Sequence, residues 1–263
     1  MGLRASADHR PAARDGVASF RFYEELNDFL APERRKRRFE HAFRGPVAVK
    51  DVVEALGVPH TEIDLILVNG RSVRFSYRLR DRDVVSVYPV FETLDITPLL
   101  RLRPRPLRVS RFVLDAHLGT LARYLRLLGF DTLYRNDYSD AQLARVAHDE
   151  RRVLLTRDVG LLKRSLVTRG CFLRETAPLR QLHEIVRRLD LQRQIRPFRR
   201  CIKCNGLVAR IDRRRLAGVV DARILGLHTE FRRCRSCGQI YWPGTHHAQM
   251  TKIITAVSAA AQG

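Results

Sequence analysis

The chain has 263 residues, of which 45% are hydrophobic and 29% are charged. This composition excludes a disordered chain and allows one large domain or two to three smaller ones. Lys and Arg number 49 against 28 Asp and Glu, which gives a formal net charge of +21. Such an excess attracts polyanions at long range, so nucleic acid is the expected partner.

No signal-peptide-like apolar run stands at the start, and nowhere do eighteen apolar residues follow one another. We therefore expect a cytoplasmic protein that makes no membrane contact. Five cysteines in such a chain argue against a disulfide framework, since reducing compartments keep thiols free. Four of them fall into two pairs, and Cys171 is expected as a small apolar residue of a strand.

The N-terminal region predicts a small domain after a disordered tail at residues 1–16. "VASFRFY" alternates as a half-buried strand does, and "VAVKDVVEALGV" places its valines on one helical face before Gly57. "IDLILVNGRSV" turns at Asn-Gly, and "DVVSVYPVFE" is a last strand. The order strand, strand, helix, strand, strand predicts a β-grasp-like domain over residues 17–95. Its basic cluster at 34–38 is expected to be a solvated loop, with a binding patch as the alternative.

Three prolines among arginines in "TPLLRLRPRPLR" predict an extended linker at residues 96–109. The pattern then changes over residues 110–195. Apolar strands such as "RFVLD" and "RVLLTRD" alternate with amphipathic helices such as "SDAQLARVAHDE", in which Ser139 stands at a capping position. Strands that alternate with helices predict a parallel sheet covered on both faces.

The paired cysteines have the spacing of a tetrahedral four-thiolate zinc site. The pairs are Cys201-x2-Cys204 and Cys234-x2-Cys237. Thiols that bind no metal are the alternative. A four-cysteine site has no open coordination position, so the zinc is expected to be structural. The two cysteine pairs therefore predict a zinc ribbon over residues 196–250, and a C-terminal tail is expected over residues 251–263.

The segment "YWPGTHH" follows the second cysteine pair and offers Trp242 and His246 as candidates for stacking on bases and contacting phosphate. For Trp242 the alternative is a packed lid over the ribbon core.

Acidic residues stand where the predicted sheet would need them for chemistry. Asp115 ends the first strand, Asp158 follows the strand "VLLTR", and Asp140 opens a helix. The carboxyl ends of parallel strands converge on one crevice, where carboxylates can hold divalent cations that assist phosphodiester cleavage. The alternatives are a dipole-complementing role for Asp140 and a turn or cap role for Asp158.

These segments together resemble a known family. "FVLDAHLGTLARYLRLLGFDTLYRND", "LLTRDVGLLKR" and "PFRRCIKCNG...CRSCGQIYWPGTHH" resemble the PIN-like Mut-seven C-terminal RNase domain family, which ends in a zinc ribbon. "VASFRFYEEL" through "GVPHTEIDLILVNG" to "VVSVYPVFE" resembles the ubiquitin-like domain that often precedes it in bacterial proteins. The resemblance covers roughly residues 17–250.

The resemblance implies an α/β protein with a PIN-like parallel sheet, an N-terminal β-grasp domain and a C-terminal zinc ribbon. It further implies a ribonuclease that depends on Mg²⁺ or Mn²⁺ and acts on RNA. The acidic cluster carried over is Asp115, Asp140 and Asp158, with Asp137 as the fourth acid and Asp149 and Glu150 as its competitors. Arg123 and Arg157 fall near the crevice and are candidates for binding phosphate.

A second hypothesis is a non-catalytic module that binds RNA or the ribosome, because charge and ribbon support it equally well. The ubiquitin-like domain runs into a linker rather than ending in Gly-Gly, so conjugation is not expected of it. Docking a protein partner, or orienting RNA, is the remaining hypothesis for that domain.

Overall fold

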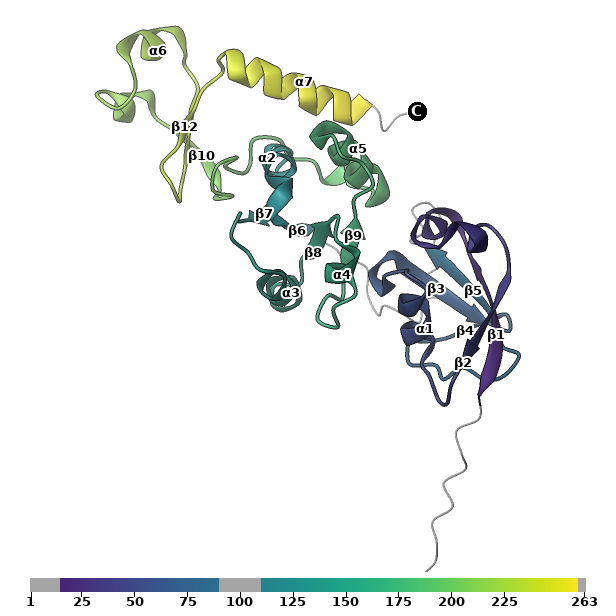
Figure 1. The fold of residues 1–263 in the computed structure, drawn as a ribbon. Coiled ribbons are helices and arrows are strands. Elements are labelled where there is room, and N and C mark those ends of the chain that lie inside the picture. The colour runs from purple at the N-terminus through teal and green to yellow at the C-terminus, as the bar shows by residue number, and fades with distance from the viewer. Residues whose placement is uncertain (1–14, 90–109, 260–263) are drawn as a thin grey trace, which may run out of the picture. The chain divides into compact units, whose positions relative to one another are not determined.

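The computed structural model describes residues 15–89 and 110–259 (Figure 1). The chain divides into two compact units, Met1–Pro106 and Leu107–Gly263. The predicted linker at 96–109, and all but the last two residues of the predicted tail at 1–16, lie outside the described residues. No helix in the described part of the chain is both long enough and apolar enough to cross a membrane.

Within residues 15–89, the first unit is a five-stranded mixed sheet with an α-helix packed on it. The strand order is β2-β1-β5-β3-β4, with β1 parallel to β5 and the other neighbours antiparallel. This confirms the predicted β-grasp architecture and adds the two-residue strand β4 after the Asn-Gly turn. The strands are β1 (Gly16–Phe22), β2 (Phe39–Phe43), β3 (Ile63–Val68), β4 (Arg71–Ser72) and β5 (Val84–Pro89).

Helix α1 (Val49–Ala55) buries Val49, Val52 and Val53 against the sheet, as the sequence predicts. The chain turns at Gly57 with a φ of +112°, a conformation that favours glycine. Most of the basic cluster at 34–38 is exposed and lies outside the strands, as expected of a loop. Short 3₁₀ helices complete the unit: Glu24–Phe29, Pro32–Arg34 and His60–Glu62.

The second unit is built on a parallel sheet of four strands within residues 110–259, in the order β7-β6-β8-β9. Cys171 is buried in β9, as predicted. Ser139 caps α3 in a reciprocal capping box with Gln142. The strands are β6 (Arg111–Leu114), β7 (Asp131–Tyr134), β8 (Val153–Thr156) and β9 (Gly170–Phe172). The helices are α2 (Gly119–Leu127), α3 (Asp140–Asp149), α4 (Val159–Leu162) and α5 (Pro178–Arg188), with 3₁₀ turns at Ala116–Leu118 and Gln192–Gln194.

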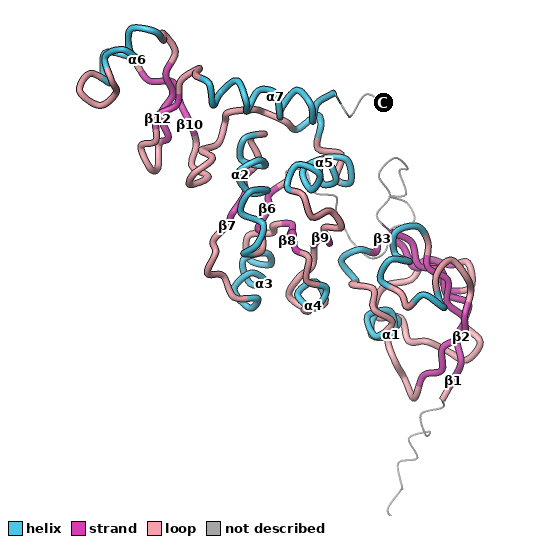
Figure 2. Tube along the Cα trace, turned by 45° about the horizontal axis from the view of Figure 1, so that its top comes forward, coloured by secondary structure: helices cyan, strands magenta, loops and turns pink. Residues whose placement is uncertain are grey.

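Helices cover both faces of this sheet, which confirms the predicted parallel α/β layer (Figures 1 and 2). Side chains alternate along a strand, so β6 sends Phe112 and Leu114 to the core under α2 and α5. Val113 between them enters the opposite core, under α3 and α4. Apolar residues on both faces explain why the strand sequences read as continuous hydrophobic runs.

The C-terminal part is a three-stranded antiparallel ribbon within residues 196–259, in the order β10-β11-β12. Its strands are β10 (Val208–Ile211), β11 (Phe231–Cys234) and β12 (Ile240–Tyr241). A 3₁₀ turn (Arg213–Leu216) and helix α6 (Ala222–Leu227) lie between β10 and β11.

The segment predicted as a C-terminal tail, residues 251–263, is a helix in its described part. Helix α7 (Thr245–Ala259) runs beyond the predicted end of the ribbon. Val257 is buried, and Ile253 and Ile254 pack with it against the core under α2 and α5. The predicted boundary at residue 250 therefore falls inside helix α7, and its later residues pack on the core.

Candidate active site and zinc centre

The strand order places a topological switch point between β6 and β8. From β6 the chain passes through α2 to β7 on one side, and it returns through α3 to β8 on the other. Ligands of open parallel sheets bind in the crevice outside the carboxyl ends of the strands at such a point. Asp115 directly follows β6, and Asp158 stands two residues after the end of β8. Two of the acids predicted from sequence therefore flank the switch point.

Thr156, at the end of β8, connects these two acids. Its buried hydroxyl donates a hydrogen bond of 2.6 Å to Oδ2 of Asp115 and accepts one of 2.9 Å from the backbone N–H of Asp158. Each acid also caps its own turn: Oδ1 of Asp115 accepts from the N–H of Ala116, and Oδ1 of Asp158 accepts from that of Gly160. Asp158 therefore has the cap role that was one of its predicted alternatives, and it also lies beside the switch point.

Asp115 is largely shielded, with 15% of its side chain exposed. Nδ1 of His117 lies 3.5 Å from Oδ2 of Asp115, and His117 is about half exposed. Sequence reasoning missed both His117 and Thr156. A signal was present for His117 in "LDAHLG", because a polar side chain two residues from a candidate acid can reach its carboxylate. Thr156 offered no such signal, since the carboxylate that it binds lies 41 residues earlier in the chain.

The structure does not gather all four predicted acids. Asp140 opens α3 at the same edge of the sheet and faces Arg164, with 3.5 Å between Oδ2 and Nη2. Both carboxylate oxygens of Asp137 accept hydrogen bonds from Arg135, at 2.9 and 2.7 Å, and these bonds lower its pKa. In the described part of the chain, the four cysteines are the only group of three or more Asp, Glu, His or Cys close enough to share a metal.

The competing candidates for the fourth acid lie beside the amino ends of the strands, opposite the ends that Asp115 and Asp158 follow. Asp149 and Glu150 stand at the end of α3, whereas Asp140 stands at its start. Glu150 binds Arg152, which also binds Asp131 at the beginning of β7. An acid at this edge is a helix length away from the carboxyl ends of the strands.

The predicted phosphate-binding arginines have different surroundings. Nη1 of Arg157 donates to the backbone carbonyls of Leu173, Arg174 and Glu175, at 2.7–3.0 Å. These bonds fasten the end of β8 to the segment after β9. Arg123 is exposed on α2 and lines a cavity described below.

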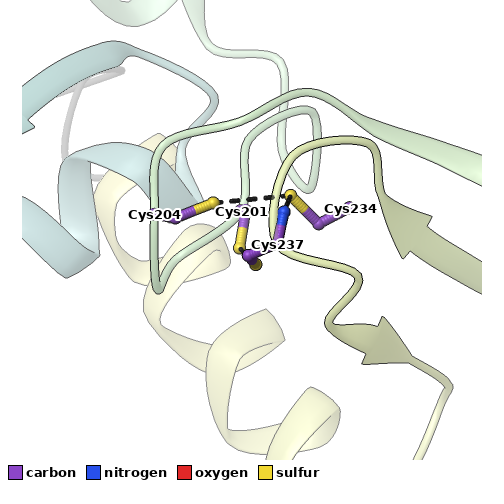
Figure 3. Close-up of side chains that lie close together, drawn as sticks. All are labelled: Cys201, Cys204, Cys234 and Cys237. Atoms are coloured by element: carbon purple, nitrogen blue, oxygen red, sulfur yellow. Dashed lines mark hydrogen bonds between the residues drawn. The ribbon is translucent and has the colours of Figure 1, made fainter.

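The four predicted zinc ligands converge, as Figure 3 shows. Their sulfur atoms all lie within 4.8 Å of one another, with 3.6 Å between Cys201 and Cys237 and 3.5 Å between Cys204 and Cys234. Tetrahedral Zn–S bonds of about 2.3 Å place the sulfurs about 3.8 Å apart, whereas a disulfide needs about 2.05 Å. The donor set and spacing therefore fit a structural zinc ion.

The thiols of this site differ in their protonation. Burial raises the pKa of Cys234, but hydrogen bonds from the N–H groups of Cys237 and Ser236 to its sulfur lower it overall to about 6. Burial raises the pKa of Cys204 to about 12. The hydrogen bonds to its sulfur therefore favour the thiolate form of Cys234, which is the form that binds a cation.

The turn that carries Cys201 and Cys204 is called the first cysteine knuckle here. It is bound to the α/β sheet through Asn205, the residue that follows it. Its side-chain oxygen accepts from the N–H of Thr132 at 2.9 Å, and its amide donates to Asp131 at 2.8 Å. Arg200 and Arg152 bind the same Asp131 carboxylate. Burial raises the pKa of Asp131, but the hydrogen bonds from Arg152 and Asn205 and the arginine charges lower it overall.

Arg126 fastens the knuckle to α2. Its Nε donates to the carbonyl of Thr132, and its Nη1 donates to the carbonyls of Ile202 and Lys203 at 3.2 and 3.1 Å. Hydrogen bonds therefore join the α/β domain to the residues between Cys201 and Cys204 and to Asn205, which follows them.

Trp242 and His246, the predicted base-contacting residues, follow β12. Trp242 is half-buried and lines a small cavity of about 100 Å³ together with Phe198, His247 and Met250. His247 stacks on Phe198 with 4.5 Å between ring centroids. The role of Trp242, as a base-contacting residue or as a lid, stays a prediction. The side chain of His246 lies outside the described residues.

A larger cavity, of about 770 Å³, lies between α2 and the zinc ribbon. One wall comes from the turn after Asp115 and from α2, and the other comes from the cysteine knuckles and β12. None of the described residues that line it is acidic. Its polar and aromatic side chains include His117, Thr120, Arg123, Arg126, Lys203 and Tyr241.

Comparison with protein-family models gives two matches. Residues 110–254 match the Mut7-C RNAse domain, which alone is more than half of the chain, and residues 16–95 match the Mut7-C ubiquitin domain. The chain belongs to the Mut7-C RNase domain family. No match was found among curated proteins or among solved structures.

Membership of the Mut7-C family confirms the resemblance inferred from the sequence, including the ubiquitin-like domain that comes before the RNase domain. It implies ribonuclease activity and therefore a nucleic-acid substrate. Both the acids at the switch point and the four cysteines fall within the matched RNase domain.

Proposed function

We propose that this Mut7-C protein is a divalent-metal-dependent ribonuclease whose reaction takes place beside Asp115 and Asp158. The observation that carries the proposal is the position of these two acids at the carboxyl edge of the sheet, connected by Thr156. The switch point is where an open parallel sheet binds its ligand, and the family match supports the reaction type.

The residues at this edge fit Mg²⁺ or Mn²⁺. Mg²⁺ is usually held by one or two carboxylates together with waters and substrate phosphates, so the acid pair suffices without a fourth acid. Asp115 and Asp158 would hold the ion, and Asp140 at the same edge would contribute through water. When bound, the ion would activate water and neutralise charge on the scissile phosphate.

The chain's own groups orient this site. Thr156 and the N–H of Ala116 each bind one oxygen of the Asp115 carboxylate, which fixes its rotation. His117 stands beside Asp115 on the exposed side and provides an imidazole that can accept or give a proton there.

Other parts of the chain serve binding. In this proposal the charge of +21 concentrates RNA at the surface, and the ribbon over residues 196–250 holds RNA near the acids of the α/β domain over 110–195. The ubiquitin-like domain over 17–95 offers a docking surface for a protein partner.

The test is cleavage of labelled structured and single-stranded RNAs in Mg²⁺ or Mn²⁺ by wild type, Asp115→Asn and Asp149→Asn. Asp149 is a matched control because it is an exposed acid at the opposite edge of the sheet. We expect cleavage by wild type and Asp149→Asn only. Equal cleavage by all three proteins would place the reaction elsewhere.

A non-catalytic RNA- or ribosome-binding module is the second candidate. It is favoured by one observation: among the described residues, the acids do not gather in a group of three. Salt-sensitive RNA binding by wild type, with the RNA intact in both metals, would support this candidate over the nuclease.

A further inference from the structure

We infer that the cavity between α2 and the zinc ribbon binds the phosphodiester backbone of single-stranded RNA next to the proposed reaction site. We call this cavity the knuckle groove; the residues of it that carry the argument are His117, Thr120, Arg123, Arg126, Lys203 and Tyr241. The inference rests on the proposed function in taking RNA as the substrate.

The charge of the knuckle groove selects an anion. Arg123 and Lys203 are exposed and make no ion pair with the described residues. Arg126 is buried, and its hydrogen bonds to three backbone carbonyls hold the groove wall in place. No acidic side chain of the described residues lines the groove, and the exposed charges of Arg123 and Lys203 face each other across its two walls.

The size and lining of the groove favour a single strand. A volume of about 770 Å³ falls in the range of ligand-binding clefts, which is the size expected of a site for a few nucleotides of one strand. Proteins that bind single strands combine a basic groove, which follows the backbone, with aromatic rings that stack on bases. Tyr134 and Tyr241 supply half-buried rings in the two walls of the groove.

The groove opens on the proposed reaction site through His117. This residue forms part of the groove wall, and its Nδ1 lies 3.5 Å from Oδ2 of Asp115. A strand bound along Arg123 and Lys203 would therefore bring a neighbouring phosphate to Asp115. The groove would position the substrate, while Asp115 and Asp158 take part in the chemistry.

The zinc site would set the position of one groove wall. Lys203 lies between the ligands Cys201 and Cys204, and its carbonyl is bound by Arg126 on α2. A zinc ion that fixes the knuckle would thus fix the distance between Lys203 and Arg123. This gives the structural metal a role in RNA binding without a role in cleavage.

The experiment measures binding of a fluorescent 12-nucleotide single-stranded RNA to the full-length, zinc-loaded chain, without added Mg²⁺ or Mn²⁺, over a series of salt concentrations. The groove variant is Arg123→Ala/Lys203→Ala. The matched control is Arg145→Ala/Lys252→Ala, which removes one Arg and one Lys from exposed positions on α3 and α7. Zinc content and thermal unfolding establish that each variant is folded.

Each phosphate contact to a single strand contributes about 0.7 to the slope of log K against log salt. We expect the groove variant to reduce that slope by about 1.4 and to raise Kd at 0.1 M salt by about 10- to 30-fold. The control variant should keep the wild-type slope. Equal slopes for the groove and control variants would overturn the inference.

The same proteins separate the two proposals. Cleavage that depends on Asp115, together with an unchanged slope of log K against log salt in the groove variant, would support the proposed ribonuclease and contradict RNA binding in the groove. A reduced slope in the groove variant, with no cleavage by wild type in either metal, would support RNA binding in the groove and contradict the proposed ribonuclease. Tighter binding of a duplex of the same length would overturn the assignment to single strands.

Discussion

The hydroxyl of Thr156 donates a hydrogen bond of 2.6 Å to Oδ2 of Asp115, which lies 41 residues earlier in the chain. The hydroxyl oxygen of Thr156 also accepts a hydrogen bond of 2.9 Å from the backbone N–H of Asp158. One buried side chain therefore fixes both acids at the switch point.

If Asp115 holds the metal ion as proposed, Thr156→Val should slow RNA cleavage by about 10- to 100-fold, the usual effect of removing a group that orients a metal ligand. Valine has nearly the same shape but leaves Asp115 without its donor and the Asp158 N–H without its acceptor. The loss of these bonds should cost about 1–3 kcal/mol of unfolding free energy. Thr156→Ser is the control and should restore most of the activity; a fully active Thr156→Val would contradict the positioning role.

We predict that the chain binds one zinc ion per molecule at the four cysteines. Replacing Cys201 by Ser, or removing the metal with a chelator, should abolish zinc binding and lower the melting temperature, because closing the knuckles is coupled to folding. Metal analysis and thermal unfolding test this. Cys171→Ser, in strand β9, is the control and should retain the zinc; loss of zinc in that variant as well would argue against the site.

We predict that Asp131→Asn lowers the unfolding free energy by about 1.5–3 kcal/mol at neutral pH, since Asp131 accepts charge-assisted bonds from two arginines. Its pKa in the folded chain is below the ordinary 3.8. The ionised group therefore stabilises the fold above that ordinary value, and this stabilisation is lost as pH falls through the lower folded pKa.

Chemical denaturation at a series of pH values tests this prediction. Below about pH 5, the unfolding free energy of wild type should fall more steeply than that of Asp131→Asn, and the two should converge in acid. Parallel curves for the two proteins would show that Asp131 does not anchor the knuckle.

We predict that Val257→Asp unfolds the second unit at a markedly lower temperature, because it places a charge in the core under α2 and α5. The expected cost is about 3–5 kcal/mol. Lys252→Asp, on an exposed part of the same helix, is the control and should have little effect. Equal melting temperatures for the two variants would mean that α7 is not part of the core.

The sequence by itself determined the features that are encoded within a few residues. The spacing of Val49, Val52 and Val53 defined a buried helical face, and the two Cys-x2-Cys pairs defined the metal ligands. It also placed Asp115 and Asp158 after their strands. Alternating strands and helices then sufficed to expect a parallel sheet, because periodicity records which side of each element is buried.

Only the tertiary structure decided which polar groups meet. The bonds from Thr156 to Asp115 and from Asn205 to Asp131 join residues 41 and 74 positions apart, and they depend on strand order and docking. Such contacts leave no local pattern in a chain, because their energy comes from geometry that exists only after the elements have packed.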